Sequence, residues 1–385
     1  MKQKNLFLAL IPVMFSFFVM GFVDLVGTAT NYIKADFDLS HTISNLLPSM
    51  VFFWFLIFSV PTGMMMNRIG RRKTVVISLA INAIALTIPL VNYSFISMLI
   101  SFSLLGIGNT LMQVSINPLL SNIISGNKLA SSMTFGQFVK AIASFLAPIL
   151  ASWAAKELGD WKLLFPIFMS IAILATVWLG FTSIEEEKMN RQNSTFLQCF
   201  TLLGNKMILL SFLGIICHVG IDVGINVTAP KILMERLDMV LNDAIYATSV
   251  YFLFRTIGCF SGAFILARFS DKKFFGISVT LMLLAIVGFF TFKSLIPIYV
   301  CVALIGLGNS NIFPVIVSQA MLSLPDKKNE VSALMIMGLF GGTIFPLLMG
   351  ALTDVLNSQT GALLILSIGI IYLACLTVKL KDKIV

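Results

Sequence analysis

Long runs of apolar residues alternate with short polar connections along almost the whole chain. A helix needs about 20 predominantly apolar residues to cross the hydrocarbon core of a bilayer, and the runs in this chain are of about that length or longer. The pattern therefore predicts twelve transmembrane helices, which it places at residues 6–33, 42–66, 74–92, 95–123, 130–155, 163–183, 207–232, 242–267, 275–292, 295–323, 331–354 and 360–379.

One connection, residues 184–206, is longer and more polar than the others. We expect it to be a cytoplasmic linker between an N-terminal bundle of six helices, residues 1–183, and a C-terminal bundle of six helices, residues 207–385. The predicted fold class is an all-α membrane protein with twelve transmembrane helices in two pseudo-symmetric six-helix bundles.

The two halves share sequence features at an offset of about 200 residues. Gly106–Thr110 in the fourth predicted helix matches Gly306–Ser310 in the tenth. Ser132–Pro148 in the fifth predicted helix matches Ser332–Pro346 in the eleventh. Internal repeats of this kind are typical of transporters, whose substrate site lies near the middle of the membrane at the interface between the repeats.

Composition supports a membrane protein, because 58% of the 385 residues are hydrophobic and 11% are charged, whereas soluble domains carry about 25% charged residues. We attribute the net charge of +9 to membrane orientation rather than to nucleic-acid binding, since the Lys and Arg residues are concentrated in short connections. Eighteen of them lie in the termini and one set of alternate connections, and six lie in the other set: Lys34, Lys156, Lys162, Lys231, Arg236 and Lys293. This asymmetry predicts that both termini and the linker are cytoplasmic. We expect the membrane to be a bacterial inner membrane.

Amide side chains form a stripe on the predicted fourth helix. Asn109, Gln113 and Asn117 recur at four-residue spacing, so they share one face. An unpaired amide in hydrocarbon costs several kcal/mol, and we therefore expect this face to meet other helices or a water-filled cavity. A transport pathway is the functional interpretation of the stripe, and hydrogen bonding between helices is the structural one.

Four ionisable residues, Asp24, Lys140, Asp222 and Arg255, are predicted to lie well inside membrane helices, where such groups mark functional sites by default. Asp24 is the candidate proton carrier, with Lys140 as its partner. A carboxyl group held between an apolar environment and a nearby cation can take up and release a proton as its exposure changes. For both acid–base pairs, Asp24 with Lys140 and Asp222 with Arg255, a static structural role is the alternative.

Other polar residues share helix faces with these ionisable ones. His218, Asp222 and Asn226 recur at four-residue spacing on the predicted seventh helix, and Asn31 shares a face of the first helix with Asp24. The candidate substrate-binding residues are therefore Asn109, Gln113, Asn117, Gln137, Asn31, His218, Asp222, Asn226 and Arg255.

The connection between the second and third predicted helices reads Gly63-Met-Met-Met-Asn-Arg-Ile-Gly-Arg-Arg-Lys73. It resembles the G-x-x-x-D-R-x-G-R-R/K signature of the major facilitator superfamily, with Asn67 in place of the acidic residue. The resemblance implies a gating loop that includes Gly63, Asn67, Arg68, Gly70 and Arg71, although Asn67 cannot form an ion pair there. A shortened copy of the signature, Ala267–Lys273, stands at the corresponding place in the second half.

Within that superfamily the chain is similar to the fucose–galactose–glucose:proton symporter family. Gly106–Pro118 resembles its G-x-G-x-x-x-[EQ]-x-x-x-N-P motif, and Val219–Gly224 resembles its V-G-x-E-x-x-x-G motif with Asp222 for Glu. Weaker similarities lie in the first, fifth and eighth predicted helices, at Asp24–Phe37, Phe135–Gln137 and Phe254–Gly258. Fucose permeases of the family have an acid at the position of Gln113, whereas glucose and galactose members often have Gln. That departure argues against assuming fucose specificity.

The resemblance implies a secondary transporter that imports a monosaccharide, a hexose or deoxyhexose, by proton symport with alternating access between two bundles. Its partners would be a sugar, a proton and the lipid bilayer, and we expect a monomer. Amides offer the donors and acceptors that suit sugar hydroxyls. The aromatic residues Trp54, Tyr251 and Phe340 are candidates to cover the apolar face of the sugar.

Several alternatives stay open at this point. An exporter of drugs or metabolites would share the fold, and a sugar carrier could be sodium-coupled or uncoupled. A membrane receptor without transport activity would be expected to carry large loops or soluble domains. An enzyme is disfavoured, because no nucleophile–base or metal constellation appears in the sequence, and we expect no cofactor. A metal site is disfavoured, because the chain has only two histidines, His41 and His218, and its five cysteines lack metal or redox spacing.

Overall fold

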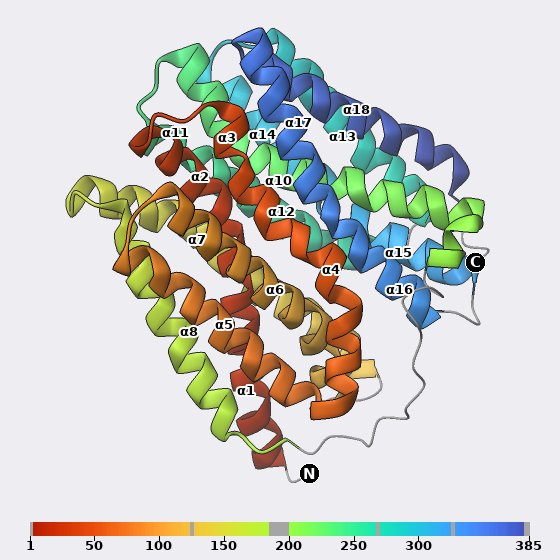
Figure 1. Ribbon diagram of the computed structural model, residues 1–385. Helices are drawn as coiled ribbons and strands as arrows, with labels where there is room; N and C mark the ends of the chain where they lie inside the picture. The colour runs from red at the N-terminus through yellow and green to blue at the C-terminus, as the bar shows by residue number, and fades with distance from the viewer. Residues whose placement is uncertain (1–2, 124–126, 185–199, 267–269, 325–327, 381–385) are drawn as a thin grey trace. The chain divides into compact units, whose positions relative to one another are not determined.

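The computed structural model describes residues 3–123, 127–184, 200–266, 270–324 and 328–380, and within these residues the regular structure is helical without a β-strand. Most of the predicted linker, residues 185–199, lies outside the described residues, as does Ala267 with the two residues after it in the shortened signature copy. Figure 1 follows the helices from the N-terminus to the C-terminus.

The twelve predicted spans are all occupied by helix, some by two or three consecutive helical pieces. In the first half these are α1 (Gln3–Met20) with α2 (Leu25–Asp36), α3 (His41–Ser44) with α4 (Leu46–Ile69), α5 (Arg71–Val91), α6 (Phe95–Ile123), α7 (Asn127–Glu157) and α8 (Leu164–Phe181). In the second half they are α10 (Lys206–Leu237), α11 (Leu241–Ala244) with α12 (Tyr246–Leu266), α13 (Asp271–Thr291), α14 (Leu295–Asn309) with α15 (Ile312–Ser323), α16 (Lys328–Met337) with α17 (Gly341–Leu356), and α18 (Thr360–Lys379). Eleven segments within the described residues are long and apolar enough to cross a membrane, and α12 occupies the remaining predicted span.

The chain forms two compact units. The first contains residues 1–26 and 57–193, and the second contains residues 27–56 and 194–385. This division differs from the predicted halves in one respect, because the end of the first membrane segment and the beginning of the second belong with the C-terminal residues.

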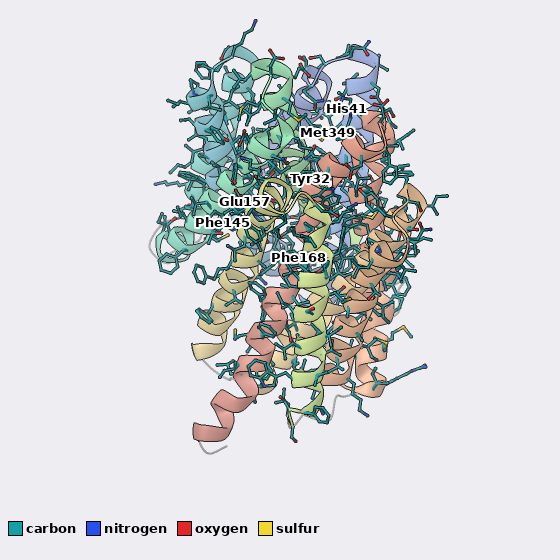
Figure 2. All side chains as sticks on the ribbon, turned by 90° about the vertical axis from the view of Figure 1, so that its left-hand side faces the viewer. Tyr32, His41, Phe145, Glu157, Phe168 and Met349 are labelled. Carbon is teal, nitrogen blue, oxygen red and sulfur yellow. The ribbon has the colours of Figure 1, made fainter. Side chains whose placement is uncertain are left out.

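In the first unit, α5 packs against α6 and α8, and α1 packs against α6, α7 and α8. The ring of Phe22 stacks on the ring of Phe168 from α8, with 4.1 Å between their centroids. Phe168 is labelled in Figure 2. Both rings are almost fully buried, so this part of the core is held by apolar contact.

In the second unit, α10 is the central helix, and it contacts α12, α14, α15, α17 and α18. Nearly every residue of α10 between Gly214 and Leu233 is buried or half-buried, which is consistent with a helix surrounded by others. The short helix α3 packs on α17 in the same unit. Figure 2 labels His41 at the start of α3 and Met349 on α17.

Glycines at equivalent positions let α6 pack closely on α5 and α14 pack closely on α13. A Cβ atom on Gly108 would lie 3.1 Å from the carbonyl oxygen of Ser78, and one on Gly308 would lie 2.5 Å from the carbonyl oxygen of Ser278. Both pairs are separated by the 200-residue offset of the sequence repeat. Small residues allow membrane helices to approach closely, and here they do so at equivalent positions in the two halves.

The first membrane segment is interrupted in its middle. Helix α1 ends at Met20, a 3₁₀ turn, η1, covers Gly21–Asp24, and α2 begins at Leu25. A Cβ atom on Gly21 would lie 2.5 Å from the carbonyl oxygen of Lys140 on α7, so the glycine permits a close approach of η1 to α7. Short 3₁₀ stretches inside long helices often mark functional hinges.

Four of the six residues that were assigned to the second set of connections lie in α-helices instead: Lys34 in α2, Lys156 in α7, and Lys231 and Arg236 in α10. Lys231 and Arg236 belong to α10, which continues to Leu237 rather than ending near residue 232. Lys231 is buried, and Arg236 donates a hydrogen bond of 3.0 Å to the carbonyl oxygen of Phe292. Packing against neighbouring helices sustains α10 beyond the point at which its apolar run ends.

Candidate functional site

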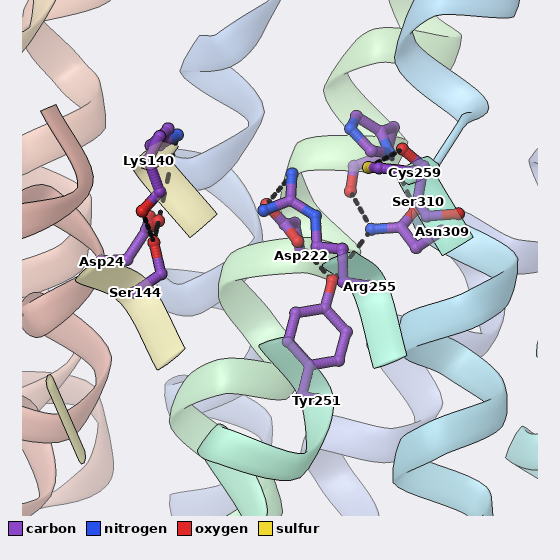
Figure 3. A network of polar contacts seen from close by, with 10 residues as sticks. Asp24, Lys140, Ser144, Asp222, Tyr251, Arg255, Cys259, Asn309 and Ser310 are labelled. Atoms are coloured by element: carbon purple, nitrogen blue, oxygen red, sulfur yellow. Dashed lines mark hydrogen bonds and ion pairs between the residues drawn. The ribbon is translucent and has the colours of Figure 1, made fainter. Parts of the chain in front are cut away.

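Asp24, Lys140 and Ser144 form a polar cluster in the first unit, which we call the Asp24 cluster (Figure 3). The Nζ atom of Lys140 lies 3.9 Å from Oδ2 of Asp24. The hydroxyl of Ser144 donates a hydrogen bond of 2.5 Å to the same oxygen. The predicted pairing of Asp24 with Lys140 is therefore present, and Ser144 joins it.

Local structure explains how the cluster forms. Lys140 and Ser144 are four residues apart on α7 and therefore lie on one face of that helix. Asp24 is the last residue of η1, and Gly21 at the start of the turn lets η1 approach that face. The side chains of Lys140 and Asp24 keep 16% and 11% of their surface exposed, so neither is fully sealed from its surroundings.

A second polar group lies in the second unit, which we call the Asp222 network. Nη2 of Arg255 on α12 lies 3.1 Å from Oδ2 of Asp222 on α10. The hydroxyl of Tyr251, also on α12, donates a hydrogen bond to Oδ1 of Asp222. Both carboxylate oxygens of Asp222 are therefore engaged, as Figure 3 shows.

Asn309 on α14 extends the Asp222 network to His218. Its amide nitrogen donates to the hydroxyl of Tyr251 at 3.2 Å and to the carbonyl oxygen of His218 at 3.3 Å. Its amide oxygen accepts a hydrogen bond of 2.8 Å from Nδ1 of His218. Three helices thus contribute to one connected set of polar groups, which fixes the side chains that belong to it.

The counterpart of Asn309 in the first half behaves differently. Asn109 on α6 is 1% exposed, and neither its amide nitrogen nor its amide oxygen has a hydrogen-bond partner among the described residues. A buried polar group of this kind calls for an explanation. The amide of Asn109 is thus free to accept a ligand or a water molecule, whereas that of Asn309 is not.

The remaining predicted binding residues are placed as follows. Asn31 is buried, and its amide nitrogen donates a hydrogen bond of 3.0 Å to the carbonyl oxygen of Gly27. Its amide oxygen has no hydrogen-bond partner among the described residues. Asn226 is buried on α10 within the same unit, where its amide packs against Gly27. Gln113 is half-buried and Gln137 is exposed. The side chain of Asn117 lies outside the described part of the structure.

One of the predicted aromatic residues has a different role. Tyr251 is fully buried and bonded to Asp222, so its ring is not free to cover a sugar. Tyr251 was a candidate because it is aromatic, and its residue type alone could not show that its hydroxyl meets a carboxylate on another helix. Trp54 and Phe340 are both half-buried, and each packs near the ring of Phe53.

The predicted gating loop makes a tight turn between α4 and α5. Gly70 adopts a φ of 95°, a conformation that favours glycine. Nη1 of Arg71 donates a hydrogen bond of 3.2 Å to the carbonyl oxygen of Pro118 on α6. Arg68 is exposed, and a Cβ atom on Gly63 would meet nothing within 4 Å. The side chain of Asn67 lies outside the described part.

Sequence reasoning missed the contact between α3 and α17. Both oxygens of Asp354 at the end of α17 accept backbone N–H bonds from α3, from His41 at 2.9 Å and from Thr42 at 2.8 Å. A carboxylate at a helix N-terminus satisfies amides that have no partner within the helix. Gly350 permits the approach, because a Cβ atom there would lie 2.8 Å from the carbonyl oxygen of His41.

Buried polar groups continue this contact along α4. The amide nitrogen of Asn45 donates a hydrogen bond of 2.8 Å to the carbonyl oxygen of Pro346 on α17. Its amide oxygen accepts a hydrogen bond of 3.2 Å from Nζ of Lys231 on α10. Ser49 and Thr343 exchange hydrogen bonds, each hydroxyl donating to the carbonyl oxygen of the other residue at 3.0 and 2.9 Å. Asp354 stands six residues before α18, which begins at Thr360, and nothing in the sequence around it indicates this role.

The described residues contain no group of three or more His, Cys, Asp or Glu side chains that could hold a metal ion. The polar groups instead consist of two acid–base pairs with hydroxyl and amide neighbours. Such groups can bind a proton and hydroxyl-rich ligands.

Comparison with known proteins decides the family. The sequence pattern of the Major Facilitator Superfamily matches residues 6–265 and, in a second match, residues 211–383. The chain belongs to the Major Facilitator Superfamily. A glucose/galactose transporter of Brucella abortus biovar 1 (strain 9-941) is 25% identical over 385 residues, which cover 92% of this chain and 90% of that protein. As a member of this superfamily, the chain is a multi-pass membrane transporter and not an enzyme.

Solved structures of the superfamily share the fold. The E. coli fucose:proton symporter FucP matches with a TM-score of 0.69 and 16% identity, over 97% of this chain and 98% of that one. The nucleoside transporter NupG matches with a TM-score of 0.79 and 13% identity, over 97% and 98% of the two chains. The predicted twelve-helix major facilitator fold is thereby confirmed.

Proposed function

We propose that this transporter imports a monosaccharide, a hexose or deoxyhexose, together with a proton, by alternating access. The observation that carries the coupling is the Asp24 cluster. It places an ionisable carboxyl inside a membrane segment, where it contacts the ammonium group of Lys140 and the hydroxyl of Ser144 and is still partly exposed. Ionisable groups in such segments mark ion and proton pathways.

The contrast between the two acid–base pairs supports Asp24 rather than Asp222 as the proton carrier. Asp222 is held at 3.1 Å by Arg255 and also by Tyr251, whose hydroxyl is in turn fixed by Asn309. Asp24 meets Lys140 at the longer distance of 3.9 Å. The ion pair of Asp24 with Lys140 is thus the longer of the two and costs less to separate, so Asp24 fits the role of the carrier and Asp222 the structural role.

Two observations support a sugar as the substrate. The chain is similar over most of its length to a protein that is named a glucose/galactose transporter. In addition, the buried amides of Asn109 and Asn31 retain hydrogen-bonding atoms without partners among the described residues. Sugar hydroxyls both donate and accept hydrogen bonds, and they would satisfy such atoms. Gln113, Asn117 and Gln137 in the first unit and Asn226 in the second unit are further candidate ligands.

The proposed cycle links the proton to the sugar. With Asp24 protonated, its attraction to Lys140 is lost, Lys140 is released, and sugar binds. With Asp24 deprotonated and the ion pair with Lys140 formed, the sugar-free transporter changes access back to the other side of the membrane. Release of the proton and the sugar on the same side then completes one round of symport.

The orientation and the access changes are also proposals. The excess of Lys and Arg on one set of connections supports cytoplasmic termini. With that orientation, the contact of α3 and the first turns of α4 with α17 lies on the external side, and we propose that it closes the external entrance. Single cysteines test the orientation: Lys206→Cys should react only with reagents that reach the cytoplasm, and Glu157→Cys should react from outside.

Reconstituted full-length protein tests the proposed function. Counterflow with a panel of labelled hexoses and deoxyhexoses should reveal at least one sugar that exchanges. Addition of that sugar to proteoliposomes in a sodium-free medium should make the external medium more alkaline. Uptake that needs sodium, or uptake without a change of external pH, would contradict proton symport. Exchange of no sugar in the panel would contradict the substrate class and favour an exporter of other compounds.

A further inference from the structure

Ser144 is not part of the proposed ion pair, yet its hydroxyl has two acceptors within reach. Its Oγ atom lies 2.5 Å from Oδ2 of Asp24 and 3.3 Å from the carbonyl oxygen of Lys140, one turn earlier on α7. Ser144 is buried, so water does not compete freely for the hydroxyl. A hydroxyl has one hydrogen to donate, and it therefore serves one of these two acceptors at a time.

We propose that Ser144 is a positioning residue that sets the proton affinity of Asp24 by exchanging hydrogen-bond acceptors. This inference rests on the proposed function. While Asp24 is ionised, the Ser144 hydroxyl donates to its carboxylate. When Asp24 takes up one proton from water, a single O–H bond forms on the carboxyl, and that O–H donates to Oγ of Ser144. The hydroxyl hydrogen of Ser144 then turns to the carbonyl oxygen of Lys140.

The exchange of acceptors acts on the proton affinity of Asp24 in one direction only, because a hydrogen bond to a charged acceptor is roughly twice as strong as one to a neutral acceptor. Ser144 therefore favours the ionised form of Asp24 and assists release of the proton. Lys140, the charged group that faces Asp24 from α7, acts in the same direction. The two residues differ in reach, since the hydroxyl is fixed to the helix and the ammonium group is carried on a flexible chain.

Gly21 links this exchange to helix packing. The 2.5 Å that would separate its Cβ atom from the carbonyl oxygen of Lys140 shows that η1 approaches α7 at the turn that carries the second acceptor. A shift of η1 away from α7 would separate Asp24 from the Ser144 hydroxyl and raise the affinity of Asp24 for a proton. Proton affinity is in this way made to depend on how closely the two elements pack.

The test measures the pH at which labelled-sugar exchange falls to half its maximum, in proteoliposomes with the full-length protein. Ser144→Ala removes the donor, so protonated Asp24 should persist to higher pH and the midpoint should move by about one pH unit in the alkaline direction. Ser144→Thr keeps a hydroxyl and should restore the midpoint. Ser144→Cys has a weaker donor and should give a smaller shift in the same direction, which keeps the test informative if the Ala variant does not fold.

Controls separate this inference from the proposed function. Ser115 on α6 is also buried and bonds the carbonyl oxygen of Leu111 one turn earlier, so Ser115→Ala should leave the midpoint unchanged. Asp24→Asn should abolish the pH dependence. If it does so and neither Ser144→Ala nor Ser144→Cys shifts the midpoint, the role of Ser144 is wrong and the carrier role of Asp24 stands. If Asp24→Asn keeps the pH dependence of the wild type, the proposed function itself is wrong.

Discussion

Asn309 donates a hydrogen bond of 3.2 Å to the hydroxyl of Tyr251, which in turn donates to Asp222. The residue at the equivalent place in the first half, Asn109, has neither amide atom bonded among the described residues. The repeat has therefore kept the side chain and changed its surroundings. One amide is committed to holding three helices together, and the other is free for a ligand.

This contrast gives a paired prediction. Asn309→Ala removes three hydrogen bonds, and it should lower the unfolding temperature of the purified protein by an amount that corresponds to about 1–3 kcal/mol. Asn109→Ala removes no protein hydrogen bond that we observe, so the unfolding temperature should stay level or rise. Its apparent affinity for sugar should instead fall by about 1–3 kcal/mol. Equal loss of stability in both variants would show that Asn109 is also structural.

A second prediction concerns the close approach of α14 to α13. A Cβ atom on Gly308 would lie 2.5 Å from the backbone oxygen of Ser278 and 2.6 Å from the side chain of Met282. Gly308→Ala should therefore force the helices apart, at a cost of about 1–3 kcal/mol. Thermal unfolding in detergent measures the effect. Gly180→Ala is the control, because a Cβ atom there meets nothing within 4 Å, and comparable losses in both variants would count against the packing argument.

Helix number and placement could be predicted from the sequence because they depend on local hydropathy and length. Each expected span is occupied by helix, and the offset of about 200 residues places Gly108 and Gly308 against the same kind of backbone oxygen. The pairing of Asp24 with Lys140 was also predictable, since a charge inside a membrane segment needs a partner.

Other features depend on contacts between distant segments, and the sequence pattern does not encode them locally. Asn309 meets His218 and Tyr251 only because α14 packs beside α10 and α12. Lys231 was counted with a connection although it stands inside the predicted span 207–232, and in the structure it is buried on α10, which continues to Leu237. The first segment is broken at η1, where it approaches α7 closely. Gly21 permits this approach, but a single glycine in the sequence does not predict it.

A third prediction concerns Asp354. Its carboxylate accepts the backbone N–H groups of His41 and Thr42 and also the Thr42 hydroxyl at 2.5 Å. Asp354→Ala should weaken the packing of α3 on α17, since loss of a helix cap costs about 1 kcal/mol. Hydrogen–deuterium exchange of a peptide that contains these two amides should therefore become several-fold faster.

Asp160 supplies a matched control for Asp354. It caps the turn η2 (Trp161–Leu163) by accepting a hydrogen bond of 2.9 Å from the backbone N–H of Lys162. Asp160→Ala should speed exchange at Lys162 and leave the α3 peptide unchanged. An α3 peptide that exchanges equally fast in the wild type and in Asp354→Ala would contradict the proposed closing contact.

Proton coupling through Asp24 is the central claim, and Asp24→Asn addresses it directly. The amide resembles the protonated acid in shape and in charge, so the variant should still bind sugar and exchange it at equilibrium. It has no proton to release, and it should therefore fail to accumulate sugar when a pH gradient is applied. Asp222→Asn should affect coupling less, because Asp222 is held by both Arg255 and Tyr251.

The decisive measurement compares sugar exchange with gradient-driven accumulation in the same vesicles, for the wild type, Asp24→Asn and Asp222→Asn. We predict that Asp24→Asn keeps exchange near the wild-type rate and shows no accumulation above the external sugar concentration. Accumulation of sugar several-fold against its gradient by Asp24→Asn would show that Asp24 is not the proton carrier.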